Sequence, residues 1–171
     1  MNLNNKDKNT FSQNLIKEAT IKLLSEKELS QISISEISKV SAVSRVTIYR
    51  NFNTKEDIVK ANILDLLSYW IKYHANASTR NEADIMFAKL FGIIQENKDF
   101  FLLLQKRNLL YLLREILKDT FGPTKDQENF SAYLNAFYFA GLFGWVEEWI
   151  DRGMVESADV MEKYLKKRTI Q

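Results

Sequence analysis

The chain has 171 residues, enough for one sizeable domain or for a small domain joined to a larger one. Apolar residues make up 46% and charged residues 27%, as in an ordinary soluble protein. The sequence contains no Cys, which excludes a disulfide framework, a thiolate zinc site and a cysteine nucleophile and suits a reducing cytoplasm, where we expect the protein to work.

Membrane and targeting signals are weak. The first ten residues are polar, so we expect neither a signal peptide nor an anchor there. The most apolar stretch, Phe130–Val146, is short for a span of ~20 residues and runs into Glu147 and Glu148. We interpret it as a buried helix. The net charge is only +2, with a mild positive excess over residues 1–60, where ten Lys and Arg face seven Asp and Glu.

Apolar residues recur at helical spacing along the whole chain, and no strand pattern appears. We predict an all-α protein of about nine helices in two domains. Residues 1–53 would form a three-helix bundle with a helix-turn-helix, and residues 54–171 a larger helical domain that a connecting helix opens. The segments predicted as helical are about 10–27, 34–41, 45–52, 55–74, 83–95, 98–120, 129–152 and 158–168.

Three polar residues mark the starts of consecutive short helices. Ser33 precedes an S-x-x-E capping box that ends at Glu36, and Ser44 precedes the next apolar-periodic segment. Thr54 is the third cap, with Asp57 in place of the usual Glu. Three capped starts this close together indicate three helices with tight joints, as in a helix-turn-helix.

The helix that follows Ser44 has two different faces. Ile48 and Phe52 lie four positions apart and should face the core, which leaves a polar face outside. We propose that residues on this outer face contact DNA bases: Arg45, Val46, Thr47, Arg50 and Asn51. Arg can bond guanine O6 and N7 together, Asn can bond adenine N6 and N7, and Val can touch a thymine methyl. For any one polar residue the alternative is a solvated surface group.

The stretch Ile32–Asp57 resembles the N-terminal domain of the TetR (tetracycline repressor-like) family of transcriptional regulators. The matching residues, within roughly residues 10–60, are Ser33, Val43, Ser44, Thr47, Ile48, Tyr49, Phe52, Lys55, Glu56 and Asp57. The sequence departs from the family pattern at Ala42 and Val46, where Gly is common, so the resemblance does not carry over an operator sequence.

The resemblance implies partners and roles. It implies binding of double-stranded DNA by a homodimer, no cofactor, and phosphate contacts from Ser33, Ser44, Tyr49 and Lys55. Capping alone also explains Ser33. It further implies that the larger domain carries the dimer interface and binds an unidentified small-molecule effector.

Small residues recur at strict i+4 spacing in the helix predicted over residues 129–152. Such a stripe lets another helix approach closely, and with its aromatic flank we assign it to the homodimer interface: Ala132, Ala136, Phe137, Ala140, Gly144 and Trp145. The alternative is a groove filled by another helix of the same chain.

An aromatic interior with a few polar side chains is the expected effector pocket. We assign to it Trp70, His74, Phe91, Asn108, Tyr111 and Tyr138. The alternative is an ordinary filled core, and His74 also fits a helix end or the surface.

Three functional classes can be compared with these features. One His, no Cys, no Gly-rich phosphate loop and no metal-ligand motif argue against an enzyme and against a metal site. An adaptor or co-activator acting through a partner protein remains the alternative. The polar face from Arg45 to Lys55 favours a sequence-specific DNA-binding regulator, most simply a repressor of a pseudo-palindromic operator.

Overall fold

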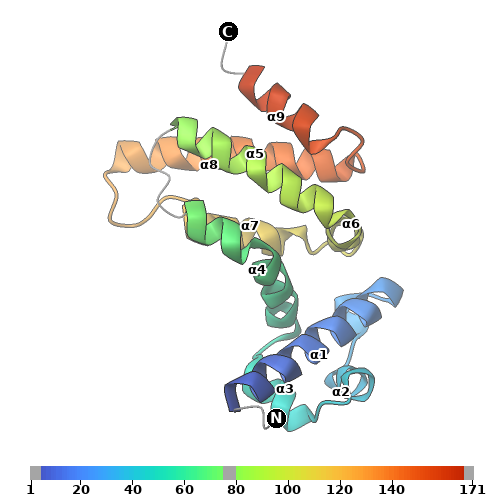
Figure 1. Ribbon diagram of the computed structural model, residues 1–171. Coiled ribbons are helices and arrows are strands. Elements are labelled where there is room, and N and C mark those ends of the chain that lie inside the picture. Colours follow the sequence, from blue (N-terminus) through green and yellow to red (C-terminus); the bar gives the residue numbers. More distant parts are fainter. Residues whose placement is uncertain (1–4, 75–79, 168–171) are drawn as a thin grey trace. The chain divides into compact units, whose positions relative to one another are not determined.

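Helices make up the regular structure of the residues that the computed structural model describes, 5–74 and 80–167 (Figure 1). Within these residues nine α-helices and one 3₁₀ turn follow one another without a strand, which confirms the all-α prediction. In chain order the elements are α1 (Asn5–Glu26), η1 (Leu29–Gln31), α2 (Ile34–Ser41), α3 (Arg45–Asn51), α4 (Lys55–His74), α5 (Arg80–Glu96), α6 (Lys98–Lys106), α7 (Leu110–Phe121), α8 (Asn129–Asp151) and α9 (Ala158–Lys167).

The first compact unit extends to Asp65 and contains α1, η1, α2, α3 and the first half of α4. α1 packs on both α2 and α3, and α2 packs on α3 (Figure 1). The largest fully buried side chains of this unit are all aliphatic: Ile16, Leu24, Ile32, Ile37, Ile48, Ile58 and Ile63. Burial of each contributes roughly 1.5–3 kcal/mol, so this small core holds the helices together.

The helix starts in this unit use the three predicted caps. The Ser33 hydroxyl accepts from the Glu36 N–H at 3.2 Å, and the Glu36 carboxylate accepts from the Ser33 N–H at 2.9 Å. The Ser44 hydroxyl accepts from the Thr47 N–H at 3.2 Å. At α4 the Thr54 hydroxyl accepts from the Asp57 N–H at 3.0 Å, and the Asp57 carboxylate accepts from the Thr54 N–H at 2.9 Å. Asp therefore completes the capping box here.

The turn between α2 and α3 places a residue with a Cβ in the left-handed region. Ala42 has φ 56° and ψ 20°, a conformation that Gly adopts without cost. The position thus requires positive φ, and Ala costs about 1 kcal/mol there.

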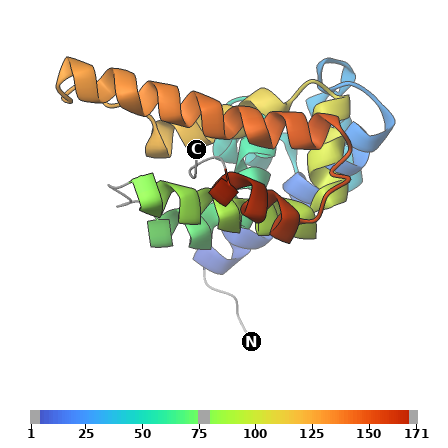
Figure 2. The same cartoon turned by 90° about the horizontal axis from the view of Figure 1, so that it is seen from above.

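The second compact unit begins at Leu66 and contains the rest of α4 with α5–α9. α8 packs on α6 and α7, and α9 packs on α5 (Figure 2). Aromatic rings meet in its interior, as where Trp149 lies edge-on to Phe91 with 5.3 Å between ring centroids. The Trp70 indole N–H donates to the Met86 carbonyl at 3.0 Å, which anchors the second half of α4 on α5.

One predicted helix is wrong. The segment 98–120 is two helices, α6 and α7, because the chain turns at Asn108, which has φ 55°. Asn tolerates this left-handed conformation better than most residues. The Leu109 N–H then bonds the Leu104 carbonyl at 2.8 Å and closes the turn. The apolar spacing runs on through both helices, so periodicity alone did not reveal the break.

The predicted ends of the helices over 98–120 and 129–152 agree with the structure to within one residue. α7 ends at Phe121, directly before Gly122 and Pro123. α8 ends at Asp151, and Gly153 follows with φ 77°, as expected of a glycine just past a helix end.

Contacts divide the chain within α4, between Asp65 and Leu66, whereas the sequence pattern places the boundary at about residue 54. The first half of α4 belongs to the N-terminal unit because Ile58, Val59 and Ile63 are fully buried in it. An ion pair between Lys17 of α1 and Asp65 lies at the end of that half. None of the described helices has the length and apolarity needed to span a membrane.

Candidate nucleic-acid interface

α3 presents one face to the core and another to solvent. Ile48 is fully buried and Phe52, just after the helix, is 9% exposed. On the opposite side Val46 is 78% exposed and both Arg45 and Arg50 are exposed. Of the five residues assigned to base contacts, these three therefore have side chains that a DNA groove can reach directly.

The two arginines of this face, Arg45 and Arg50, make no polar contact with other described residues. Within the described part of the chain, neither the Arg45 nor the Arg50 guanidinium makes a hydrogen bond or an ion pair. A guanidinium carries five donors in a planar fork, which suits a guanine edge or a phosphate. An exposed arginine without a partner among the described residues can bind DNA without first breaking a contact to them.

The other two residues assigned to base contacts are engaged within the chain. The Thr47 hydroxyl lies 2.9 Å from the Ser44 hydroxyl. The Asn51 amide uses both ends, since its oxygen accepts from Gln13 at 3.1 Å and its nitrogen donates to the Thr47 carbonyl at 2.8 Å. Asn51 thus links α3 to α1. Gln13 was not singled out from the sequence, and no local motif marks it.

The starts of α2 and α4 lie beside Tyr49 and share one open hollow of about 370 Å³. Ser33, Tyr49 and Lys55 are among the residues that line it, so three of the four residues assigned to phosphates lie on one surface. Tyr49 is 61% exposed. Ser44, the fourth, is exposed at the start of α3.

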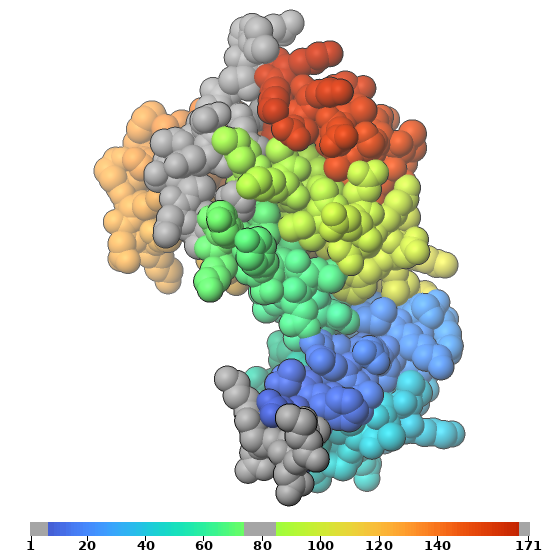
Figure 3. Space-filling view, in the orientation of Figure 1, coloured from blue at the N-terminus to red at the C-terminus, as the bar shows by residue number. Residues whose placement is uncertain are grey.

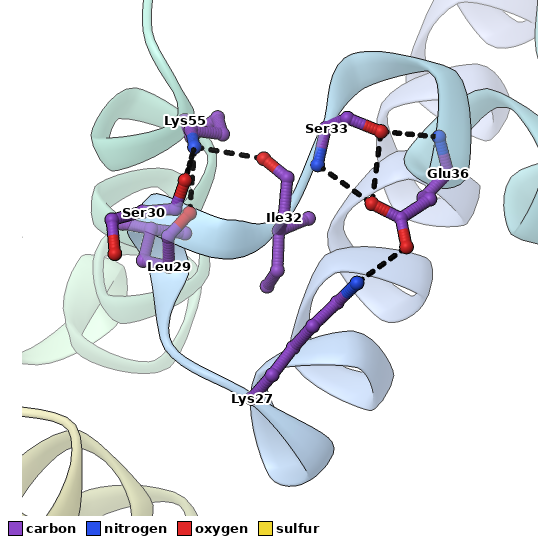
Figure 4. A network of polar contacts seen from close by, with 7 residues as sticks. All are labelled: Lys27, Leu29, Ser30, Ile32, Ser33, Glu36 and Lys55. Carbon is purple, nitrogen blue, oxygen red and sulfur yellow. Dashed lines mark hydrogen bonds and ion pairs between the residues drawn. The ribbon is translucent and has the colours of Figure 1, made fainter.

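Lys55 differs from the other three because its ammonium is already surrounded (Figure 4). The Nζ atom lies 2.6 Å from the Leu29 carbonyl oxygen, 2.8 Å from that of Ile32 and 3.3 Å from that of Ser30. An ammonium group has three donors, and three carbonyls take them here. While these bonds hold, no donor remains for a phosphate.

On the other side of Ile32 and Ser33 from Lys55, Glu36 is the centre of a second set of contacts (Figure 4). Its carboxylate pairs with Lys27 at the end of α1 and accepts from both the N–H and the hydroxyl of Ser33. The Lys27 bond first, and then the Ser33 bonds, lower the pKa of Glu36 from 4.5 to about 2. Glu36 is therefore charged at any pH at which the protein would meet DNA.

The six residues assigned to an effector pocket do not share one environment. Trp70 and Phe91 are buried and pack against the rings of Phe121 and Trp149. Asn108 and Tyr111 are exposed at the α6–α7 joint, where the left-handed turn accounts for Asn108. Tyr138 is half-buried on α8. The side chain of His74 lies outside the described residues.

The six residues assigned to a dimer interface lie along α8, and three of them are exposed while three are half-buried. The side chains of residues 129–138 are all exposed or half-buried, and the orange segment that includes them forms an outer edge of the C-terminal unit (Figure 3). Phe137 is 73% exposed, and Ala136 and Ala140 are exposed. Ala132, Gly144 and Trp145 are half-buried. Sequence reasoning left out Phe130, which is 66% exposed on the same helix.

Two family models match the chain. The one described as "Bacterial regulatory proteins, tetR family" matches residues 16–61, which include all of α2 and α3. The one described as "Transcriptional regulator C-terminal region" matches residues 81–170, more than half of the chain. A comparison with curated proteins finds no match. With its helix-turn-helix and these two matches, the chain belongs to the tetR family of bacterial regulatory proteins and is a DNA-binding transcriptional regulator.

Proposed function

We propose that the protein is a homodimeric repressor that binds a pseudo-palindromic operator and leaves it when a small-molecule effector binds. The observation that carries the DNA-binding part is the outer face of α3, where Arg45, Val46 and Arg50 are exposed. Within the described residues, neither the Arg45 nor the Arg50 guanidinium makes a hydrogen bond or an ion pair. Their chemistry matches guanine edges in a major groove.

The roles on this face follow from what each side chain is free to do. Arg45 and Arg50 read bases, and Val46 contacts a thymine methyl. Thr47 joins them by rotating its hydroxyl away from Ser44, which costs one exposed hydrogen bond. Asn51 would read adenine only after giving up its bonds to Gln13 and to the Thr47 carbonyl.

Phosphate contacts fix the register in which the bases are read. Ser44 and Tyr49 are exposed and carry hydroxyl groups that can donate to phosphate oxygens. The exposed Ser33 hydroxyl would first have to give up its bond to the Glu36 carboxylate. Ser33 and Tyr49 line one hollow between the starts of α2 and α4, so one phosphate could contact both.

Homodimerisation is supported by the surface of α8. Phe130, Tyr133 and Phe137 are each at least 66% exposed, and such an apolar strip on one helix marks an interaction site. A Cβ added at Gly144 would meet no described atom within 4 Å, so packing within the chain does not require Gly there. Gly lowers helix stability by about 1 kcal/mol relative to Ala. Close approach by a second chain would be a physical reason for Gly at position 144.

A dimer also supplies what one motif lacks. Helix-turn-helix dimers place two recognition helices in half-sites about one helical turn apart, roughly 34–36 Å, or a multiple of it. Twofold symmetry of the protein then corresponds to the inverted repeat of a pseudo-palindrome.

Release by an effector is supported by the course of α4. This helix begins at Lys55 among the residues of the DNA-binding unit and is anchored in the C-terminal unit through Leu67 and Trp70. A molecule that displaces Trp70 from Met86 and Phe121 therefore acts on the helix that starts beside α2. It weakens DNA binding only by the difference between its affinities for the two states.

A salt series of gel shifts with the gene's own upstream DNA tests the proposal, together with sedimentation of the free protein. A dimeric regulator binds tightly and specifically, and log K falls steeply and linearly with log salt. Absent or salt-insensitive binding would overturn the regulator and favour an adaptor that works through a partner protein. A monomer in sedimentation at the concentration that saturates DNA would overturn the dimer. Thermal-shift screening with small molecules, followed by gel shifts, tests the effector.

A further inference from the structure

Lys55 stands at an unfavourable place for a positive charge. It is the first residue of α4, where the helix dipole favours anions, and Glu56 and Asp57 follow it as expected of a first turn. Its side chain turns away from its own helix and reaches η1, 23 to 26 positions earlier in the chain. Carbonyls at the end of a helical turn favour a cation, and the Leu29 carbonyl accepts from Lys55 in addition to the Ile32 N–H at 3.2 Å.

The bond from Lys55 to Ile32 acts on a single peptide unit that is held from both sides (Figure 4). The Ile32 carbonyl accepts from Lys55 at 2.8 Å, while the N–H of the same peptide, that of Ser33, donates to Glu36 at 2.9 Å. Because a peptide unit is planar, these two bonds together fix its orientation. This peptide leads directly into α2.

The position of α2 determines the position of α3. The Ser38 hydroxyl donates to the Val43 carbonyl at 2.7 Å, and the Val43 N–H donates to the Ser41 hydroxyl at 3.2 Å, so the turn is held from within α2. Val43 is itself 8% exposed. A shift at the start of α2 is therefore passed on to the start of α3, the helix proposed to read the DNA bases and called the recognition helix below.

We propose that Lys55 is a positioning residue for DNA recognition: its ammonium holds the Leu29, Ser30 and Ile32 carbonyls and so couples the start of α4 to the start of α2, and it does not act as a phosphate ligand. This inference rests on the proposed DNA-binding function. It replaces the role that family resemblance implies for Lys55. The coupling also gives α4 a direct connection to the helix-turn-helix, through a side chain that is half-buried in the unit it organises.

Two substitutions separate a positioning lysine from a phosphate ligand. Lys55→Met removes the charge and keeps the length of the side chain. Lys55→Arg keeps the charge but replaces a compact ammonium by a longer planar fork, which does not direct three donors at the same three carbonyls. Arg is a good phosphate ligand, so a phosphate contact survives this second substitution.

The control is Lys22→Met, because Lys22 is exposed on α1 in the same unit and lines no part of the hollow. Each protein is titrated with the upstream DNA at four salt concentrations, well below its melting temperature. Amide hydrogen exchange over residues 33–37 is followed in the free full-length proteins. The exchange measurement needs no DNA and so remains informative if the regulator proposal fails.

We expect both Lys55 variants to lose about tenfold or more in affinity with the slope of log K against log salt unchanged, and to exchange faster over residues 33–37. The control should match the wild type in both. If the slope of log K against log salt became shallower by about 1 in Lys55→Met while Lys55→Arg bound DNA normally, Lys55 would instead be a phosphate ligand. A lowered melting temperature with unchanged affinity, or unchanged exchange in both variants, would equally overturn the proposal. Failure of the wild type to bind DNA would instead refute the proposed function.

Discussion

Gln13 of α1 donates to the Asn51 amide oxygen of α3 at 3.1 Å, a contact between residues 38 positions apart. It holds the last residue of the recognition helix, whose amide nitrogen bonds the Thr47 carbonyl at 2.8 Å. Asn51 therefore has a structural role that its place on the outer face of α3 concealed. Measurements of protein stability can show whether Asn51 supports α3 or only contacts bases.

A double-mutant cycle with Gln13→Ala and Asn51→Ala tests this role. We expect each single variant to lower the free energy of unfolding by about 0.5–1.5 kcal/mol, as a hydrogen bond of this kind contributes. The double variant should lose less than the sum, because the second substitution finds the bond already gone. Urea unfolding followed by circular dichroism measures it. Strict additivity would mean that the contact contributes nothing.

Ala42→Gly should stabilise the N-terminal unit. Ala42 has φ 56°, and replacing it by Gly removes a Cβ clash of about 1 kcal/mol. Thermal or urea unfolding checks the sign. Ala61→Gly is the matched control, since Ala61 lies inside α4 and should lose about 1 kcal/mol. Destabilisation by both substitutions to the same extent would contradict the assigned strain at Ala42.

Glu36 should make stability depend on pH in the acid range. Its pKa in the folded protein is about 2, lowered from 4.5 chiefly by the bond from Lys27 and then by those from Ser33. Because the folded pKa lies below the unfolded one, the stabilisation is fully present above about pH 4.5 and is lost as the pH falls towards 2. Unfolding free energies measured from pH 2 to 7 should show a smaller acid loss in Glu36→Gln than in the wild type.

Lys27→Met is the companion variant for this titration. It removes the largest cause of the lowered pKa and leaves the capping box with Ser33 in place. The pKa of Glu36 in the folded protein should move part of the way back towards 4.5. The pH range over which its stabilisation is lost should then become narrower, because its lower limit rises. Identical pH profiles for Lys27→Met and the wild type would show that the ion pair has no effect on Glu36.

Arg45→Ala should relax base preference at one position of each half-site. The loss of a bidentate contact to guanine costs about 1–3 kcal/mol on the preferred sequence and little on a sequence changed at that base. Competition gel shifts with single-base operator variants measure it, and Lys22→Ala serves as the control. An equal loss on every operator variant would indicate a phosphate contact.

Ala140→Trp should dissociate the proposed dimer. Ala140 is exposed on α8 beside Phe137, which is 73% exposed, so an indole fits the single chain and obstructs a second one. Sedimentation should show a monomer with unchanged helical content, and DNA affinity should fall with it. Asp119→Trp, at an exposed position of α7, is the control and should leave the assembly intact. A stable Ala140→Trp dimer would remove this face from the interface.

Local chemistry made much of the DNA-binding unit predictable. The caps at Ser33, Ser44 and Thr54 each depend on a residue three positions further on, so a short stretch of sequence contains both partners of each contact. The buried side of α3 followed from the spacing of Ile48 and Phe52 in the same way. The exposed arginines followed because residues opposite a buried stripe face solvent.

Only the tertiary structure revealed the contacts between distant parts of the chain. The bonds from Lys55 to residues 29–32 and from Gln13 to Asn51 depend on how helices pack, and no spacing rule brings such partners together. The break at Asn108 was missed for a related reason, since apolar periodicity continues across it. Sequence determined the recognition motif and its exposed face, whereas packing decided which of its polar residues are free to meet DNA.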